Sequence, residues 1–196
     1  MSNIVKFKFK LKGTIVPNNI GGESGRFVED LLKSLGIPLD NRSGVDCKLY
    51  GFELKTRYTN ATSAQTVASM SIEKWKTTTY DNSIVKEKLQ KQYRVHIDPV
   101  FKEDPVTKKD IQVAGIIVND DFYDFSPDHI QLLIKEAYDI CREKIIAGSK
   151  DLYINGSYWG FVDRQPDSKY YNFRITAAAY KKLEEMTKTT YTTLFE

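Results

Sequence analysis

The feature that most constrains the fold is a nearly unbroken apolar run at residues 111–118, Ile-Gln-Val-Ala-Gly-Ile-Ile-Val. A short run rich in β-branched residues is typical of a strand at the centre of a sheet, with both of its faces covered. Residues 127–147 follow with apolar side chains at helical spacing, and Ser126, Pro127 and Gly148 are suited to begin and end that helix. This order predicts a sheet with helices packed on it.

Strand-type and helix-type patterns alternate along the rest of the chain. Strands are expected at residues 4–16, 93–97 and 171–175, and residues 45–57 are expected to form two short strands hinged near Tyr50 and Gly51. Helices are expected at 24–35, 83–91 and 176–186. A polar stretch at 59–71 has no clear period. The expected fold class is α/β, with a mixed β-sheet flanked by helices in a single domain of 196 residues.

Composition excludes few functions. Lys and Arg total 29 against 26 for Asp and Glu, a net charge of +3 that neither requires nor excludes nucleic acid. No apolar run approaches the ~20 residues of a membrane helix, and the N-terminus lacks the pattern of a signal peptide. Two cysteines are too few for a disulfide framework. We therefore expect a cytoplasmic protein that does not bind membranes.

The chemistry is concentrated in residues 44–57, Gly-Val-Asp-Cys-Lys-Leu-Tyr-Gly-Phe-Glu-Leu-Lys-Thr-Arg. In an extended segment Glu53, Lys55 and Arg57 point to one side. Asp46 lies seven residues before Glu53, an odd offset that a straight strand sends to the opposite face. A turn at Gly51 would bring Asp46 back, and glycine suits such a turn.

Two carboxylates beside a lysine suit the hydrolysis of a phosphodiester. Asp46 and Glu53 offer the hard oxygen ligands that Mg²⁺ prefers. Lys55 is placed to orient water or to offset charge that develops on phosphate. The alternative is structural, since an isolated Glu-x-Lys is most often an ion pair on the surface of a strand.

Other catalytic patterns have little support. His96 and His129 lie on different predicted elements, with no second ligand at the spacing of a zinc site. The chain contains no Gly-x-Ser-x-Gly or Walker sequence.

The pattern Asp46-x6-Glu53-Leu54-Lys55 resembles the signature of the PD-(D/E)xK nuclease superfamily. Residues 25–36 and 44–56 are similar to the branch that contains MutH and the restriction endonucleases MvaI and BcnI. Residues 85–90, Val-Lys-Glu-Lys-Leu-Gln, are similar to a stretch that supplies a further active-site lysine in MutH. Val45 departs from the pattern, because the family has proline there.

This resemblance implies a restriction-endonuclease-like core over about residues 20–120. It implies Asp46 and Glu53 as metal ligands, Lys55 as the lysine that positions water, Glu29 as a supporting acid, and Lys88 as the further lysine. The implied cofactor is Mg²⁺, with Mn²⁺ as a substitute, and the implied substrate is double-stranded DNA.

Residues that suit DNA contacts follow in a second region, about residues 150–196. Arginine recognises guanine, and glutamine or asparagine recognises adenine, so Arg164, Gln165 and Arg174 are candidates for base recognition. Arg57, next to the predicted site, is a further candidate for contact with DNA.

Three functions fit these residues. The first is a Mg²⁺-dependent deoxyribonuclease that cuts duplex DNA at a short sequence, like a type II restriction enzyme or a phage nuclease. The second is a strand-nicking endonuclease directed by an accessory protein, as in mismatch repair. The third is a DNA-binding module without cleavage. With one site per chain, a monomer cuts the two strands in succession, or a homodimer cuts both.

Overall fold

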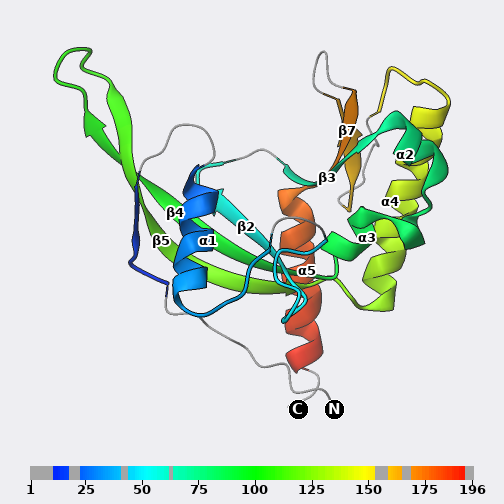
Figure 1. Ribbon diagram of the computed structural model, residues 1–196, viewed down its shortest axis with the longest axis horizontal. Helices are drawn as coiled ribbons and strands as arrows, with labels where there is room; N and C mark the ends of the chain where they lie inside the picture. Colours follow the sequence, from blue (N-terminus) through cyan, green and yellow to red (C-terminus); the bar gives the residue numbers. More distant parts are fainter. Residues whose placement is uncertain are drawn as a thin grey trace. The chain divides into compact units, whose positions relative to one another are not determined.

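The computed structural model describes residues 11–17, 23–40, 44–61, 64–152, 159–164 and 169–192. They form a mixed α/β structure that has two sheets flanked by helices, where the sequence predicted one mixed sheet (Figure 1). The chain divides into two compact units. Unit 1 comprises residues 1–61 and 91–123, and unit 2 comprises residues 62–90 and 124–196. Within the described residues, no helix is both long enough and apolar enough to cross a membrane.

The sheet of unit 1 is mixed. Its strands are ordered β1 (Ile15–Pro17), β5 (Asp110–Asp124), β4 (Lys91–Glu103) and β2 (Glu53–Tyr58). β1 is antiparallel to β5, whereas β2 is parallel to β4. A parallel pair needs a long connection between its strands, and here residues 62–90 of unit 2 belong to that connection.

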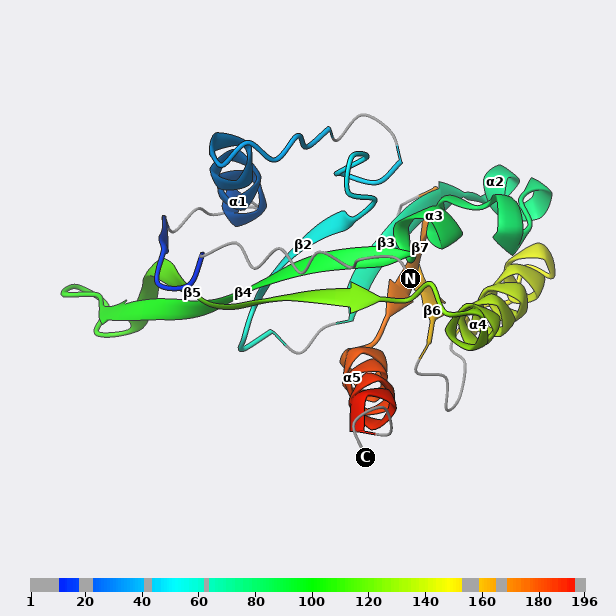
Figure 2. The same cartoon turned by 90° about the horizontal axis from the view of Figure 1, so that it is seen from below.

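Helix α1 (Glu23–Ser34) covers one face of this sheet (Figure 2). Val28 and Leu32 are fully buried in a core that they share with Leu54, Val95 and Ile97 of the strands. The helix ends as predicted, with Gly36 in the left-handed region at φ 83°.

Strand β5 includes the apolar run, but the prediction that both of its faces are buried is wrong. Ile111 is 45% exposed and Ile116 is 38% exposed. Ile116 pairs with Ile15 of β1, which is itself 66% exposed. At Gly115, which faces the side of the strand opposite to Ile116, packing is close, because a Cβ added there would lie 2.4 Å from Cγ2 of Ile97.

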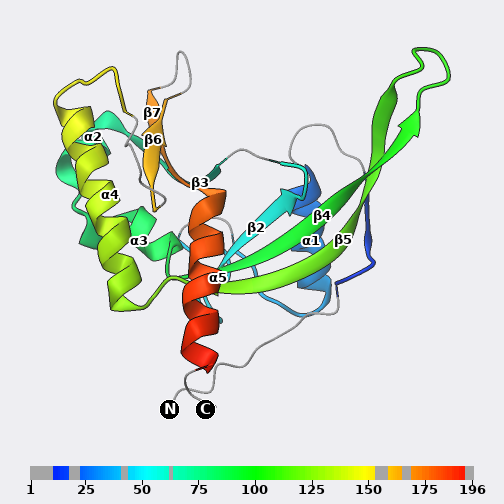
Figure 3. The same cartoon turned by 180° about the vertical axis from the view of Figure 1, so that it is seen from behind.

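Unit 2 contains an antiparallel sheet ordered β3 (Gln65–Ser71), β7 (Tyr170–Ile175) and β6 (Phe161–Asp163) (Figure 3). Its core is aromatic: Trp75 stacks on Tyr138 with ring centroids 4.8 Å apart, and both rings contact Phe173. The helices of this unit are α2 (Ile72–Thr77), the 3₁₀ helix η1 (Tyr80–Asn82), α3 (Ile84–Lys88), α4 (Asp128–Ile146) and α5 (Ala177–Thr192).

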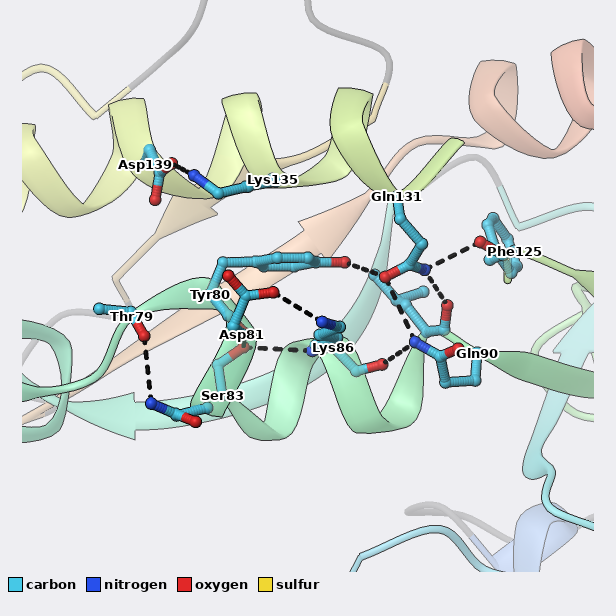
Figure 4. Close-up of polar contacts among 12 residues, drawn as sticks. Thr79, Tyr80, Asp81, Ser83, Lys86, Gln90, Phe125, Gln131, Lys135 and Asp139 are labelled. Carbon is cyan, nitrogen blue, oxygen red and sulfur yellow. Dashed lines mark hydrogen bonds and ion pairs between the residues drawn. The ribbon is translucent and has the colours of Figure 1, made fainter. Parts of the chain in front are cut away.

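The start of α4 differs from the prediction that Ser126 caps it. The N-cap residue is Pro127 and makes no side-chain cap bond, while the Ser126 hydroxyl donates to Oδ1 of Asp124 at 2.5 Å. In the first turn, Gln131 donates to the carbonyl oxygens of Leu89 and Phe125 (Figure 4). Its side-chain oxygen accepts from Tyr80 and Gln90. The amide of Gln131 thereby joins α4 to η1 and to the end of α3.

Candidate functional site

A tight reversal of the chain precedes β2. Cys47 and Phe52 form an isolated antiparallel bridge, in which the Cys47 amide donates to the Phe52 carbonyl at 2.9 Å. The Gly51 amide donates to the Cys47 carbonyl at 2.8 Å, and Gly51 itself has φ 67°. The left-handed conformation is available to glycine at little cost. The structure therefore confirms the predicted turn at Gly51.

This turn returns Asp46 to the start of β2. Oδ2 of Asp46 accepts a hydrogen bond from the backbone amide of Leu54 at 2.9 Å. That amide belongs to the peptide bond between Glu53 and Leu54, so the Asp46 carboxylate lies next to the Glu53 backbone. The turn therefore brings the Asp46 carboxylate back to the first residues of β2.

Glu53 and Lys55 form an ion pair on one face of β2. Nζ of Lys55 lies 2.8 Å from Oε1 of Glu53, and their side chains are 16% and 2% exposed. A buried carboxylate is stabilised by such a partner, since burial without one is costly. The structure confirms that the two residues share a face, as the alternation predicted.

The opposite face of β2 is occupied by α1. Leu54 belongs to the core beneath this helix, and Gly25 and Ser24 of α1 approach Thr56 and Tyr58. Glu29 lies on α1 and is half-buried. The helix that carries Glu29 therefore packs on the face of β2 opposite to that of Glu53 and Lys55.

The parallel pairing adds three residues that the sequence reasoning did not assign to the site. In the register of β2 and β4, Gln92 lies beside Glu53, Arg94 beside Lys55, and His96 beside Arg57. Side chains at paired positions share a face. We call these six residues the polar face. The alternation of polar and apolar residues at 92–97 signalled such a face, but only the strand register shows which residues it joins.

Arg57 is held near the end of β2. Its Nε and Nη2 both donate to the carbonyl oxygen of Ala61, at 3.2 and 2.5 Å. Arg94 is more deeply placed, 4% exposed, with Cζ 6.0 Å from the ring centroid of Tyr123. Both guanidinium groups therefore have defined positions within unit 1.

Lys88, the further lysine implied by the resemblance, lies in unit 2. It is the last residue of α3 and is half-buried. The helix starts at a cap formed by Ser83, whose hydroxyl accepts from the Lys86 amide at 3.2 Å (Figure 4). The structure therefore brings Asp46, Glu53 and Lys55 together in one unit and places Lys88 in the other.

The residues predicted to recognise bases belong to unit 2, whereas Arg57 belongs to unit 1. Arg174 on β7 pairs through Nε with Oδ2 of Asp163 at 2.8 Å and donates to the Ala64 carbonyl at 3.2 Å. Arg164 is exposed at the end of β6, with Cζ 5.5 Å from the ring centroid of Tyr171. Gln165 lies outside the described residues. Of the two described arginines, Arg164 is the more accessible.

Asp46 and Glu53 carry carboxylate oxygens, the kind of ligand that Mg²⁺ takes. The Asp46 carboxylate lies beside the Glu53 backbone, and Mg²⁺ is commonly held by one or two carboxylates together with water. The described residues contain no group of three or more His, Cys, Asp or Glu side chains that would enclose a metal ion. Burial raises the pKa of the neighbouring Cys47 thiol, so Cys47 is not suited to act as a thiolate ligand at neutral pH.

Comparisons with known proteins add no assignment. No protein-family model matches the chain, and no curated protein matches it.

Proposed function

We propose that the protein is a Mg²⁺-dependent endonuclease that hydrolyses phosphodiester bonds of duplex DNA. The observation that supports the proposal best is the hydrogen bond of Asp46 to the Leu54 amide, beside the Glu53–Lys55 ion pair. Asp46 precedes the turn and Glu53 and Lys55 follow it, so that two carboxylates and one lysine belong to a single segment of unit 1. The resemblance of residues 25–56 to PD-(D/E)xK nucleases supports the same chemistry.

Each residue has a distinct role in this proposal. Asp46 and Glu53 would hold Mg²⁺, with Mn²⁺ as a substitute, and the cation would supply a Lewis acid for phosphate and lower the pKa of water. The Lys55 ammonium orients the attacking water and offsets negative charge as it develops on the phosphate. The buried position of Glu53 limits access of bulk water to the pair, which strengthens the electrostatic interaction between them.

The proposal includes sequence-specific cleavage by a cytoplasmic enzyme that acts as a monomer or a homodimer. A strand-nicking enzyme directed by an accessory protein would contain the same residues. The two differ in product: a restriction-type enzyme gives discrete double-strand fragments without a partner, whereas a directed nickase gives little product alone.

A DNA-binding module without cleavage is the second candidate. The direct contact of Lys55 with Glu53 favours it, because a structural ion pair on a strand has the same geometry. In that case the pair contributes to folding and takes no part in hydrolysis.

Incubation of supercoiled plasmid with the purified protein separates these candidates. We expect cleavage in Mg²⁺, loss of cleavage in EDTA, and loss of cleavage in Glu53→Gln with DNA binding retained. The control is Asp30→Asn, because Asp30 is an exposed acid of α1 with its side chain 78% exposed. Full activity in EDTA or in Glu53→Gln contradicts the metal mechanism, and sequencing of the product ends distinguishes nicks from double-strand cuts.

A further inference from the structure

The polar face extends beyond the proposed catalytic residues and is rich in cations. Its six positions carry three basic side chains, Lys55, Arg57 and Arg94, against the single acid Glu53. His96 and Gln92 add hydrogen-bonding groups. Asp98, the next residue on this side of β4, accepts from the Thr59 hydroxyl. The basic residues therefore lie between Glu53 at one end of the polar face and Asp98 beyond its other end.

The three cations and His96 form two successive pairs across the strands, which we call ranks. Lys55 and Arg94 form the first rank, and Arg57 and His96 form the second. Residues two apart on a parallel strand are separated by about 6.6 Å. This distance is comparable to the separation of consecutive phosphates along one strand of a nucleic acid. The ranks thus repeat at the interval of a phosphate backbone.

The side chains of both ranks have defined positions and partial exposure to solvent. Arg94 lies with Cζ 6.0 Å from the ring centroid of Tyr123, and Nε and Nη2 of Arg57 donate to the Ala61 carbonyl. Lys55 is 16% exposed, and Arg57 and His96 are half-buried, so solvent reaches both ranks. Arg94, at 4% exposure, acts from a low-dielectric position where its field is weakly screened.

We propose that the polar face binds two consecutive phosphates of one DNA strand. Lys55 and Arg94 contact the phosphate of the cleaved bond, and Arg57 and His96 contact the next phosphate. This inference rests on the proposed function, since it names the part of the substrate that the same site holds. It assigns Arg94 and His96 to substrate binding and places the strand of the substrate along the direction of β2.

The test is the salt dependence of binding to a fluorescent duplex in EDTA, where no cleavage interferes. Each lost phosphate contact lowers the slope of log K against log salt by about 0.9. We expect this reduction in Arg94→Gln and in Arg57→Gln, and the wild-type slope in Arg94→Lys. The matched control is Lys102→Gln, which removes one exposed positive charge of β4 beyond the residues paired with β2.

Thermal unfolding of the same variants separates binding from folding. An unchanged slope in Arg94→Gln and Arg57→Gln overturns the inference, whether or not the melting temperature falls. If Arg94→Gln does not fold, Arg57→Gln carries the test alone. If the variants show the expected change of slope but the wild-type protein cuts no plasmid in Mg²⁺, the phosphate site is supported and the nuclease is contradicted. If the wild-type protein cuts plasmid but the variants keep the wild-type slope, the nuclease is supported and the phosphate site is contradicted.

Discussion

At the scale of single residues, Asp46 has two roles that different substitutions separate. Its carboxylate accepts the Leu54 amide and is also a proposed metal ligand. Leu54 is buried, so its amide without an acceptor would cost about 1–3 kcal/mol in the free energy of unfolding. Asparagine keeps an oxygen acceptor and removes the negative charge, whereas alanine removes both.

We therefore expect Asp46→Asn to lose cleavage with little loss of stability, and Asp46→Ala to lose cleavage and about 1–3 kcal/mol of stability. Urea denaturation measures the stability, and a plasmid assay measures the cleavage. Wild-type cleavage by Asp46→Asn would show that the residue serves the fold alone.

Lys55 and Lys48 allow a second comparison at this scale. Lys55 lies 2.8 Å from Glu53, whereas Lys48 is exposed in the turn before β2. A positioned catalytic group contributes about 10²–10⁴-fold to a rate. We expect Lys55→Ala to lower the single-turnover cleavage rate by this order and Lys48→Ala to leave it close to the wild type. Equal losses of rate in the two variants would mean that cleavage depends on the total positive charge and not on the position of Lys55.

At the scale of elements, the turn that joins Cys47 to Phe52 places Asp46 beside the start of β2. Gly51 has φ 67°, and a Cβ added there would meet no atom within 4 Å. A substitution at this position is therefore opposed by backbone strain and not by crowding. Gly25 in α1 differs, because its Cβ would make an ordinary contact at 3.5 Å from Oγ1 of Thr56.

Gly51→Ala should destabilise the protein by about 1–2 kcal/mol, the cost of a left-handed non-glycine residue, and should slow cleavage by displacing Asp46. Gly25→Ala should be neutral or stabilise α1 by up to about 1 kcal/mol, since alanine favours helices. Chemical denaturation of the two variants, together with their cleavage rates, checks both expectations. A stable and fully active Gly51→Ala would contradict the role assigned to the turn.

At the scale of the whole molecule, the two compact units carry different predicted functions. Asp46, Glu53 and Lys55 lie in unit 1, whereas Arg164 and Arg174 lie in unit 2. Arg174 forms an ion pair with Asp163, whereas Arg164 is exposed. We therefore expect the proposed base recognition to depend more on Arg164 than on Arg174.

We expect Arg164→Ala to change the preferred sequence while keeping the cleavage rate on the best remaining sites. A bidentate contact to guanine is worth about 1–3 kcal/mol at one base pair. Cleavage of a library with a randomised site, followed by sequencing, measures the change. An unchanged preference with a smaller salt slope would assign Arg164 to phosphate contact.

The sequence predicted elements best where a local pattern determines them. The end of α1 at Gly36, the strand at 171–175 and the helix that begins near residue 127 were all predicted and are present in the structure. In contrast, β3 lies within the polar stretch at 59–71 that has no clear period. Its strand conformation is stabilised by pairing with β7, about a hundred residues later, and such distant pairing leaves little trace in local propensity.

The same division holds for the candidate site. The sequence by itself determined the alternation that places Glu53 and Lys55 on one face and the glycine that permits a turn before them, because both depend on backbone geometry over a few residues. The tertiary structure decided which neighbours that face acquires. Gln92, Arg94 and His96 lie beside it through the parallel register of β2 and β4, whose connection passes through unit 2. Register across such a connection depends on burial and packing of the whole sheet, which no short stretch of sequence encodes.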